Sequence, residues 1–387
     1  MELLDLIETY RAQDASTERL YAREGRRVRG GRQDPRYKQS LAEAARLYEG
    51  VLNGRIPTWR LQEAMTTSDF ANLFGDIIDR QMLARYQHMP VMWQSVAKRN
   101  TVRDFRTVKR FTLDGGEAVL TEVPQESEYP AASLADGGYE YSVKKYGRRL
   151  PISWESFIND DLDALSDLPG RLANAARFSE ERFVTDLFAG STGPDSTFFS
   201  SGHANIVTAN PVLSVAGLTT AFTVLAAQVD TDGNPIFVNG VVLMVPPALK
   251  VAATNILNAT EILAADGGGD GTGTNQLRVA NWLTNDVTLV VNPWLPVVSS
   301  SSNGNTSWYL FADPNTGRPA MEVGFLRGHE TPELFQKSPN AVRVGGGTVD
   351  PLDGDFETDS TDHKVRHVFG GTLMDYKSAV ASNGTGS

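Results

Sequence analysis

Apolar residues recur along this chain with helical spacing in some segments and at alternate positions in others. Helical spacing predicts helices over 1–22, 37–51, 69–87, 154–188, 213–228 and 248–263. Alternation predicts strands over 103–113 and 139–153, and apolar runs predict strands over 236–247, 287–295, 308–313, 320–328 and 364–376. This mixture predicts an α+β fold, and the alternation of helices and strands over 213–335 indicates a compact α/β part.

Between the first two predicted strands lies a polar segment rich in proline and glycine, residues 116–138. An isolated two-stranded ribbon is only marginally stable in water. We therefore expect residues 104–150 to form an extended two-stranded loop that is either flexible or covered by a neighbouring subunit. Charged and aromatic residues there are the predicted inter-subunit contacts: Glu122, Glu126, Glu128, Tyr129, Lys144, Lys145, Arg148 and Arg149.

The segment 154–188 gives the longest predicted helix. Ser153 is a suitable N-cap, and Gly190 is a suitable stop. Pro169 and Gly170 fall inside this helix. Proline removes a backbone donor and crowds the preceding turn, so we expect the helix to be kinked or divided there.

Composition narrows the classes of protein to consider. The 387 residues are 41% hydrophobic and 21% charged, which is ordinary for a globular protein, and no apolar run reaches the ~20 residues needed to cross a bilayer. The first ten residues mix acidic and apolar positions and do not resemble a signal peptide.

The net charge is −11, yet Arg23–Lys38 holds seven basic residues against two acidic ones. This asymmetry is typical of a basic segment attached to an acidic body.

No catalytic, cofactor or metal site stands out from the residues. The chain has no cysteine, which excludes disulfides and thiolate chemistry. His363 and His367 lie on one side of a predicted strand without an acidic third ligand, and His203 follows two serines without the G-x-S-x-G turn of a hydrolase. Three further segments read better as a helix start, a turn and a flexible loop than as ion or phosphate sites: 159–167, 230–234 and 266–271.

A succession of segments resembles a known family. An acidic stretch around Glu122–Tyr129 is followed by YSVKKYGRRLPIS, then by FINDD, and then by the loop FFSSGHAN. In this order they resemble Mu-like major head subunits and capsid proteins of actinobacteriophages, over about Val108–Asn205. The resemblance implies the HK97-like capsid fold, with an N-terminal arm, an extended loop, a spine helix, and peripheral and axial domains. The expected ranges are 1–103 for the arm and its helices, 104–150 for the extended loop, 151–212 for the peripheral domain with its spine helix, 213–335 for the axial domain and 336–387 for the last peripheral strands.

The same resemblance implies a non-enzymatic major capsid protein, located in the virion and assembled in the host cytoplasm. Its expected partners are further copies of itself in hexamers and pentamers, packaged double-stranded DNA, and portal, scaffold and decoration proteins, with no membrane and no cofactor. The basic segment then becomes a predicted lumenal DNA contact, with binding to a neighbouring acidic surface as the alternative: Arg23, Arg26, Arg27, Arg29 and Arg32. Three alternatives stay open, namely an encapsulin-like nanocompartment shell, a hydrolase that uses His203, and another virion protein such as a tail component.

Overall fold

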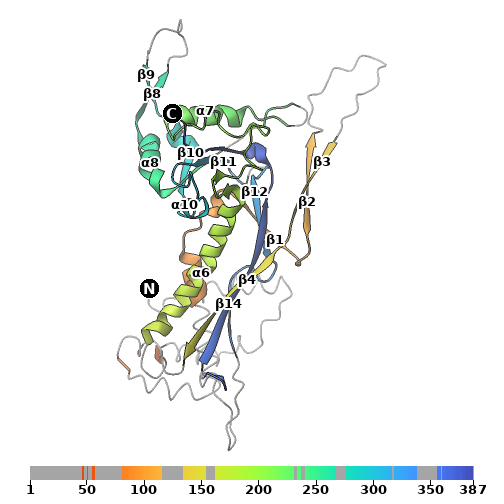
Figure 1. Ribbon diagram of the computed structural model, residues 1–387, viewed down its shortest axis with the longest axis vertical. Coiled ribbons are helices and arrows are strands. Elements are labelled where there is room, and N and C mark those ends of the chain that lie inside the picture. Colours follow the sequence, from red (N-terminus) through yellow and green to blue (C-terminus); the bar gives the residue numbers. More distant parts are fainter. Residues whose placement is uncertain are drawn as a thin grey trace, which may run out of the picture. The chain divides into compact units, whose positions relative to one another are not determined.

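The computed structural model describes residues 46–47, 50, 55–56, 81–115, 134–153, 162–230, 233–236, 240–265, 276–315, 318–337, 355–358 and 360–386. The chain divides into two compact units. Unit 1 comprises Met1–Pro90, Lys144–Ser179 and Leu326–Phe369, and unit 2 comprises Val91–Val143, Glu180–Phe325 and Gly370–Ser387. Two long elements, helix α6 (Leu162–Phe188) and strand β14 (Ser360–Leu373), contribute residues to both units (Figure 1). Helices and strands together confirm the predicted α+β class.

Unit 1 is built on an antiparallel sheet with β14 at its centre. Strand β4 (Lys144–Ser153) pairs with one edge of β14, and β13 (Glu333–Gln336) pairs with the other. Val365 points into the core of this unit, where it packs with helical residues from 81–88 and from α6. The buried members of this core are Met82, Tyr86, Leu172, Ala173, Ala176 and Val365. Side chains alternate along a strand, so the neighbouring odd-numbered positions of β14 share the same buried face.

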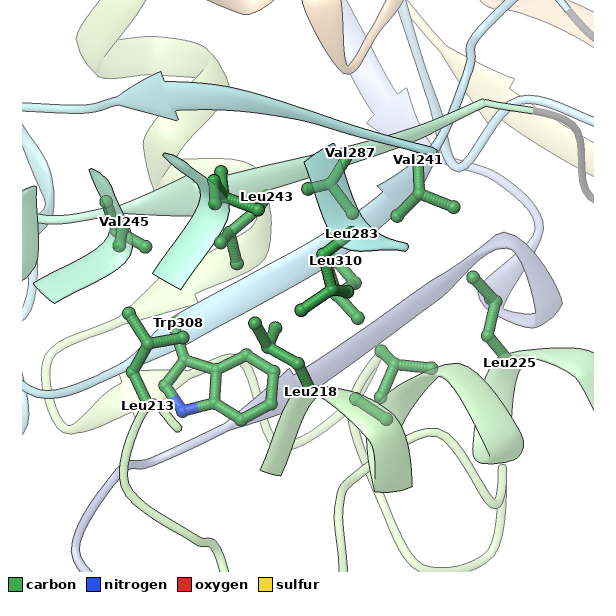
Figure 2. Packing of buried hydrophobic residues seen from close by; sticks show 14 of the residues in the cluster. Leu213, Leu218, Leu225, Val241, Leu243, Val245, Leu283, Val287, Trp308 and Leu310 are labelled. Carbon is green, nitrogen blue, oxygen red and sulfur yellow. The ribbon is translucent and has the colours of Figure 1, made fainter. Parts of the chain in front are cut away.

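Unit 2 contains a four-stranded sheet in the order β10–β7–β11–β15. These strands span Val287–Val291, Val241–Val245, Trp308–Ala312 and Ala379–Ser382. β7 runs parallel to β10 and antiparallel to β11, and every residue of β7 and β11 is buried. A continuous apolar sequence is what a strand covered on both faces requires. Figure 2 shows Leu243 and Leu310 from these strands beside Leu218 and Trp308 in the core of this unit.

Local sequence signals explain where the helices of unit 2 begin. Helix α7 (Val215–Ala226) starts at Ser214, whose side-chain oxygen accepts a hydrogen bond from the backbone N–H of Gly217 at 3.1 Å. Helix α8 (Lys250–Asn258) follows the short 3₁₀ turn η2 (Pro247–Leu249), where proline suits a first helical position. The remaining short helices of the described chain are η1 (Trp93–Ser95), α9 (Leu283–Asp286), α10 (Leu295–Val298) and η3 (Tyr376–Ser378).

The rest of unit 2 consists of paired strands. β1 (Lys98–Val102) lies beside β12 (Met321–Leu326), which in turn lies beside the end of β14. β2 (Val108–Gly115) and β3 (Leu134–Tyr141) form a separate two-stranded ribbon (Figure 1). Two further hairpins are β5 (Ala189–Gly190) with β6 (Gly193–Pro194), and β8 (Glu261–Ala265) with β9 (Gln276–Ala280).

The described elements confirm most predicted strands and correct three predictions. First, α6 continues through Pro169 and Gly170 as one helix and is not divided. Burial of Leu172, Ala173 and Ala176 stabilises the turns that follow the proline, so packing outweighs local propensity.

The second correction concerns the helix predicted over 248–263. α8 ends at Asn258, and residues from Glu261 onward form β8. The buried side chain of Asn281 causes this early end, because its Nδ2 donates hydrogen bonds to the carbonyls of Ile256 at 2.7 Å and Ala259 at 2.9 Å. An amide that satisfies the last carbonyls of a helix acts as a C-terminal cap.

The third correction concerns the returning strand predicted over 139–153. The structure divides this segment between two partners. β3 ends at Tyr141 and pairs with β2, whereas β4 begins at Lys144 and pairs with β14. Alternation of side chains predicts a strand in both parts but does not indicate the partner of either.

Candidate assembly surface

The two faces of the ribbon β2–β3 differ in what covers them. Lys109 and Phe111 lie two residues apart on one face of β2. Lys109 pairs with Glu140 across the strands at 2.8 Å, and both side chains are more than half exposed. The side chain of Phe111 is 72% exposed, and its partner across the strands is Gly138, which has no side chain to cover it. This face therefore presents a large aromatic ring to solvent.

The other face of the ribbon is fixed to unit 2 by a buried carboxylate. Arg110 of β2 and Tyr141 of β3 share that face, and both reach Glu322 of β12. The Arg110 Nε donates to Glu322 Oε1 at 2.8 Å, and the Tyr141 hydroxyl donates to the same oxygen. The carboxylate of Glu322 is almost completely buried, with a side-chain exposure of 4%. A buried carboxylate is stable only when it is paired and hydrogen-bonded, as Glu322 is.

Burial, followed by the hydrogen bond to Glu322, raises the pKa of Tyr141 well above its usual value. The hydroxyl therefore remains a donor over the whole physiological range. The Tyr141 ring lies directly over Gly324, where an added Cβ would come within 2.6 Å of the ring and the hydroxyl oxygen. Glycine at this position of β12 is what allows the ring to approach the strand.

In unit 1, the sheet face opposite the Val365 core carries a basic cluster around an aromatic ring. The Lys364 Nζ and the Arg366 guanidinium lie 5.0 Å and 4.5 Å from the centre of the Phe335 ring. Arg149 Nε donates to Asp362 at 2.7 Å, although the Arg149 side chain is 66% exposed. Such contacts hold the guanidinium and ammonium groups in place while leaving much of their surface accessible.

The structure places four of the predicted contact residues on β4 and not on the ribbon. Lys144, Lys145, Arg148 and Arg149 are all exposed, and they alternate between the two faces of the sheet. Lys145 and Arg149 share the face of Lys364, whereas Lys144 and Arg148 share the face of Val365. Strand geometry therefore separates them into two pairs and does not gather them into one patch. The remaining predicted residues lie outside the described part of the chain: Glu122, Glu126, Glu128, Tyr129, Arg23, Arg26, Arg27, Arg29 and Arg32.

His203, the residue considered for a hydrolase, lies in a loop held by internal contacts. Its ring stacks on Tyr376 with the centroids 4.1 Å apart, and its Nδ1 lies 2.9 Å from the carbonyl oxygen of Phe198. The neighbouring Ser200 Oγ accepts a hydrogen bond from the backbone N–H of His203. The side chain of Asn205 is buried and also donates to Phe198 O, at 3.0 Å. These contacts order the loop, and they do not place a serine against the imidazole as a nucleophile and its base would require.

The residues considered as metal ligands in the sequence take part in a strand and a turn. His363 and His367 lie on one face of β14, as predicted, and both are buried. Asp230 closes the predicted tight turn, because its Oδ1 accepts from the backbone N–H of Asn234 at 2.8 Å. Across the residues that the structure describes, no group of three or more histidine, aspartate or glutamate side chains could hold a metal ion. None of the described helices combines the length and apolarity needed to span a membrane.

Sequence reasoning missed Glu322, although a signal was present. The segment AMEVGFLRG was assigned as a strand, and Glu322 is the only charged residue in its apolar part. A single acid within a strand buried on both faces requires a cationic or hydroxyl partner. The identity of those partners, Arg110 and Tyr141, depends on pairing between segments more than 180 residues apart along the chain.

Comparisons with known proteins agree with this picture. A family model described as phage capsid protein matches residues 138–382, which is more than half of the chain. Among solved structures, that of Gordonia phage Cozz is similar with a TM-score of 0.43 and 14% identity, covering 74% of this chain and 83% of that one. The structure of Microbacterium phage Oxtober96 has a TM-score of 0.45 and 12% identity, with coverages of 76% and 90%. The SrpI encapsulin of Synechococcus elongatus gives 0.45 and 10%, with coverages of 77% and 89%. No curated protein matches the chain significantly.

Proposed function

The chain belongs to the phage capsid protein family, and from this membership we propose that it self-assembles into the icosahedral head of a tailed phage around double-stranded DNA. Its role as a major capsid protein is structural. One observation supports the assembly step most directly: the ribbon β2–β3 is fixed on one face and presents Phe111, 72% exposed, on the other. We propose that a second copy of the chain covers this face.

Covering Phe111 supplies a favourable free energy that polar contacts on the ribbon do not. Complete burial of a phenylalanine side chain contributes ~1.5–3 kcal/mol, whereas water screens the exposed pair of Lys109 with Glu140, which therefore contributes little. In a closed shell the same contact is repeated for every copy. A modest gain at each ribbon therefore supports a stable particle.

Electron microscopy of the purified chain tests this proposal. Wild-type protein should form closed, uniform particles, and Phe111→Ser should reduce their yield while leaving the melting temperature of the protomer unchanged. Val251→Ser is a matched control, because Val251 is 70% exposed on α8 of the same unit. Failure of the wild-type chain to form closed particles would contradict the proposed function. Equal particle yields from both variants would contradict the role of Phe111.

The charged residues predicted from the sequence add a second part to the proposal. We propose that the acidic segment with Glu122, Glu126 and Glu128 contacts basic residues of another copy. The exposure of Lys145 and Arg149 on one face of β4 supports this pairing. Reversing Lys145 to glutamate should reduce assembly, and reversing the three glutamates to lysine in the same chain should restore part of it; Arg149 is left unchanged because it pairs with the buried Asp362 of its own chain. No recovery in the combined variant would count against the pairing.

Packaged DNA and portal, scaffold and decoration proteins complete the proposed set of partners, and the host cytoplasm is the proposed place of assembly. An encapsulin-like shell is the alternative that shares the assembly step. The nucleic-acid content of particles purified from infected cells separates the two, since a phage head should contain double-stranded DNA and a nanocompartment should contain protein cargo.

A further inference from the structure

The junction between the ribbon β2–β3 and β12 joins three side chains through one oxygen atom. Glu322 Oε1 accepts from Arg110 Nε and from the Tyr141 hydroxyl, so both strands of the ribbon are bound to a single buried carboxylate. Val108 pairs with Tyr141 at this end of the ribbon, and Arg110 lies two residues further along β2. The contact therefore acts on the first residues of the ribbon and not on its distal part.

The backbone around this junction is closely packed at two glycines. The Tyr141 ring lies against Gly324 of β12. Ser142 and Val143, which follow β3, lie against Gly370 of β14. A Cβ at Gly370 would come within 2.3 Å of the Ser142 carbonyl oxygen and 2.9 Å of Val143 Cα. The strand that leaves the ribbon thus passes directly over the sheet at a point where glycine is required.

We infer that Glu322 is a positioning residue for assembly: its carboxylate, shared by Arg110 and Tyr141, fixes the direction in which the ribbon leaves unit 2 before a second copy binds. This inference rests on the proposed function. A two-stranded ribbon alone is marginally stable, and ordering it during association would lower the affinity between subunits. A ribbon that Glu322 already orders in the unassembled subunit avoids that cost.

The change Glu322→Gln tests the inference because it preserves size while altering the hydrogen bonds. A glutamine oxygen still accepts from Tyr141, but the ion pair with Arg110 is lost, and the amide group places a donor next to a guanidinium donor. Losing a charge-assisted hydrogen bond should raise the protein concentration needed for half-maximal assembly about tenfold or more. Glu261→Gln is the matched control, since Glu261 pairs with Arg278 across the exposed hairpin β8–β9. Its effect should stay below about fivefold.

Hydrogen–deuterium exchange of the unassembled 387-residue chain distinguishes a positioning role for Glu322 from a general role in stability. Glu322→Gln should accelerate exchange in β2 and β3 while β7 and β11 remain protected. Arg110→Gln should produce the same pattern, and the double variant should be no worse than Glu322→Gln alone. Faster exchange throughout unit 2 would overturn the inference, because the carboxylate would then stabilise the sheet and not the ribbon.

The outcomes also separate this inference from the proposed function. If the wild-type chain assembles and Glu322→Gln assembles at the same concentration, the positioning role is wrong and the capsid function stands. If the wild-type chain forms no closed particle, the capsid function fails whatever the exchange pattern shows.

Discussion

Two glycines of unit 2 have opposite surroundings, and this difference predicts opposite responses to the same substitution. A Cβ at Gly324 would meet the Tyr141 ring at 2.6 Å and Val102 Cγ2 at 2.8 Å, whereas a Cβ at Gly138 would meet nothing within 4 Å. Gly324→Ala should destabilise the protein by ~1–3 kcal/mol through overpacking. Gly138→Ala should be neutral or slightly stabilising, because alanine restricts the unfolded chain. Urea unfolding of the unassembled protein measures both, and equal destabilisation by the two changes would contradict the prediction.

His363 couples the stability of unit 1 to pH. The side chain is 5% exposed, and its Nδ1 has no hydrogen-bond partner in the described part of the chain. Burial lowers the pKa of His363 from 6.5, and the nearby charge of Asp362 opposes this shift only in part. The folded state therefore favours the neutral ring. As pH falls below 6.5, the unfolded chain takes up the proton first, so the folded state loses stability until the pH passes the lowered pKa.

Replacing His363 with glutamine should weaken this dependence. The melting temperature of the wild-type protein should fall between pH 7 and pH 5 by more than that of His363→Gln. His88→Gln serves as the control, because His88 belongs to the same unit but its side chain is exposed. An unchanged pH profile in His363→Gln would show that the buried ring is not the coupled group.

The position of a single residue on a strand could be predicted from the sequence, because it depends only on neighbouring residues. Its burial and its hydrogen-bond partners could not, because they depend on segments far away along the chain. The alternation of His363, Val365 and His367 was enough to place the histidines on one strand face. The same alternation does not show which face is covered, so their burial was missed. Glu322 was missed for a related reason, since its partners belong to other strands.

At the scale of elements, the sequence predicted which segments form regular structure better than it predicted their ends and partners. Apolar runs such as β7 and β11 were recognised because complete burial leaves a continuous signal. The end of α8 was not predicted correctly, because the residue that caps the helix, Asn281, lies in a later part of the chain. The partners of β3 and β4 were likewise decided by the fold and not by alternation.

The role of Asn281 in ending α8 gives a prediction at this scale. Its buried amide group donates hydrogen bonds to three backbone carbonyls, those of Ile256, Leu257 and Ala259. Asn281→Ala should remove this donor from the carbonyls of Ile256 and Ala259, while the Leu257 carbonyl still accepts from Thr284 Oγ1 at 2.7 Å. The loss should destabilise the protein by ~1–3 kcal/mol. Asn258→Ala, an exposed change on the same helix, should alter stability by less than ~0.5 kcal/mol. Chemical unfolding gives both values, and faster amide exchange confined to the end of α8 would identify the lost cap as the cause.

At the scale of the whole molecule, the distribution of charge limits how the chain can contact DNA. The net charge is −11, so a surface that attracts DNA everywhere is excluded. The segment Arg23–Lys38 has a local net charge of +5 in a chain that is acidic as a whole. It lies outside the described residues, and the prediction that it contacts packaged DNA rests on charge and on the capsid family alone.

Two sets of substitutions test that contact while separating charge from shape. Replacing Arg26, Arg27, Arg29 and Arg32 with glutamine removes four positive charges per subunit, and replacing them with lysine keeps all four. Contacts with phosphate depend on charge and weaken with salt, with a slope of about −0.9 for each phosphate neutralised on a double helix. Particles with glutamine should therefore lose DNA at lower temperature and lower salt than wild type, and particles with lysine should retain it, since lysine still binds phosphate as a point charge. Nuclease-accessible DNA, measured across a salt series, gives the comparison. Equal retention by all three would show that the basic segment faces protein or solvent and not the genome.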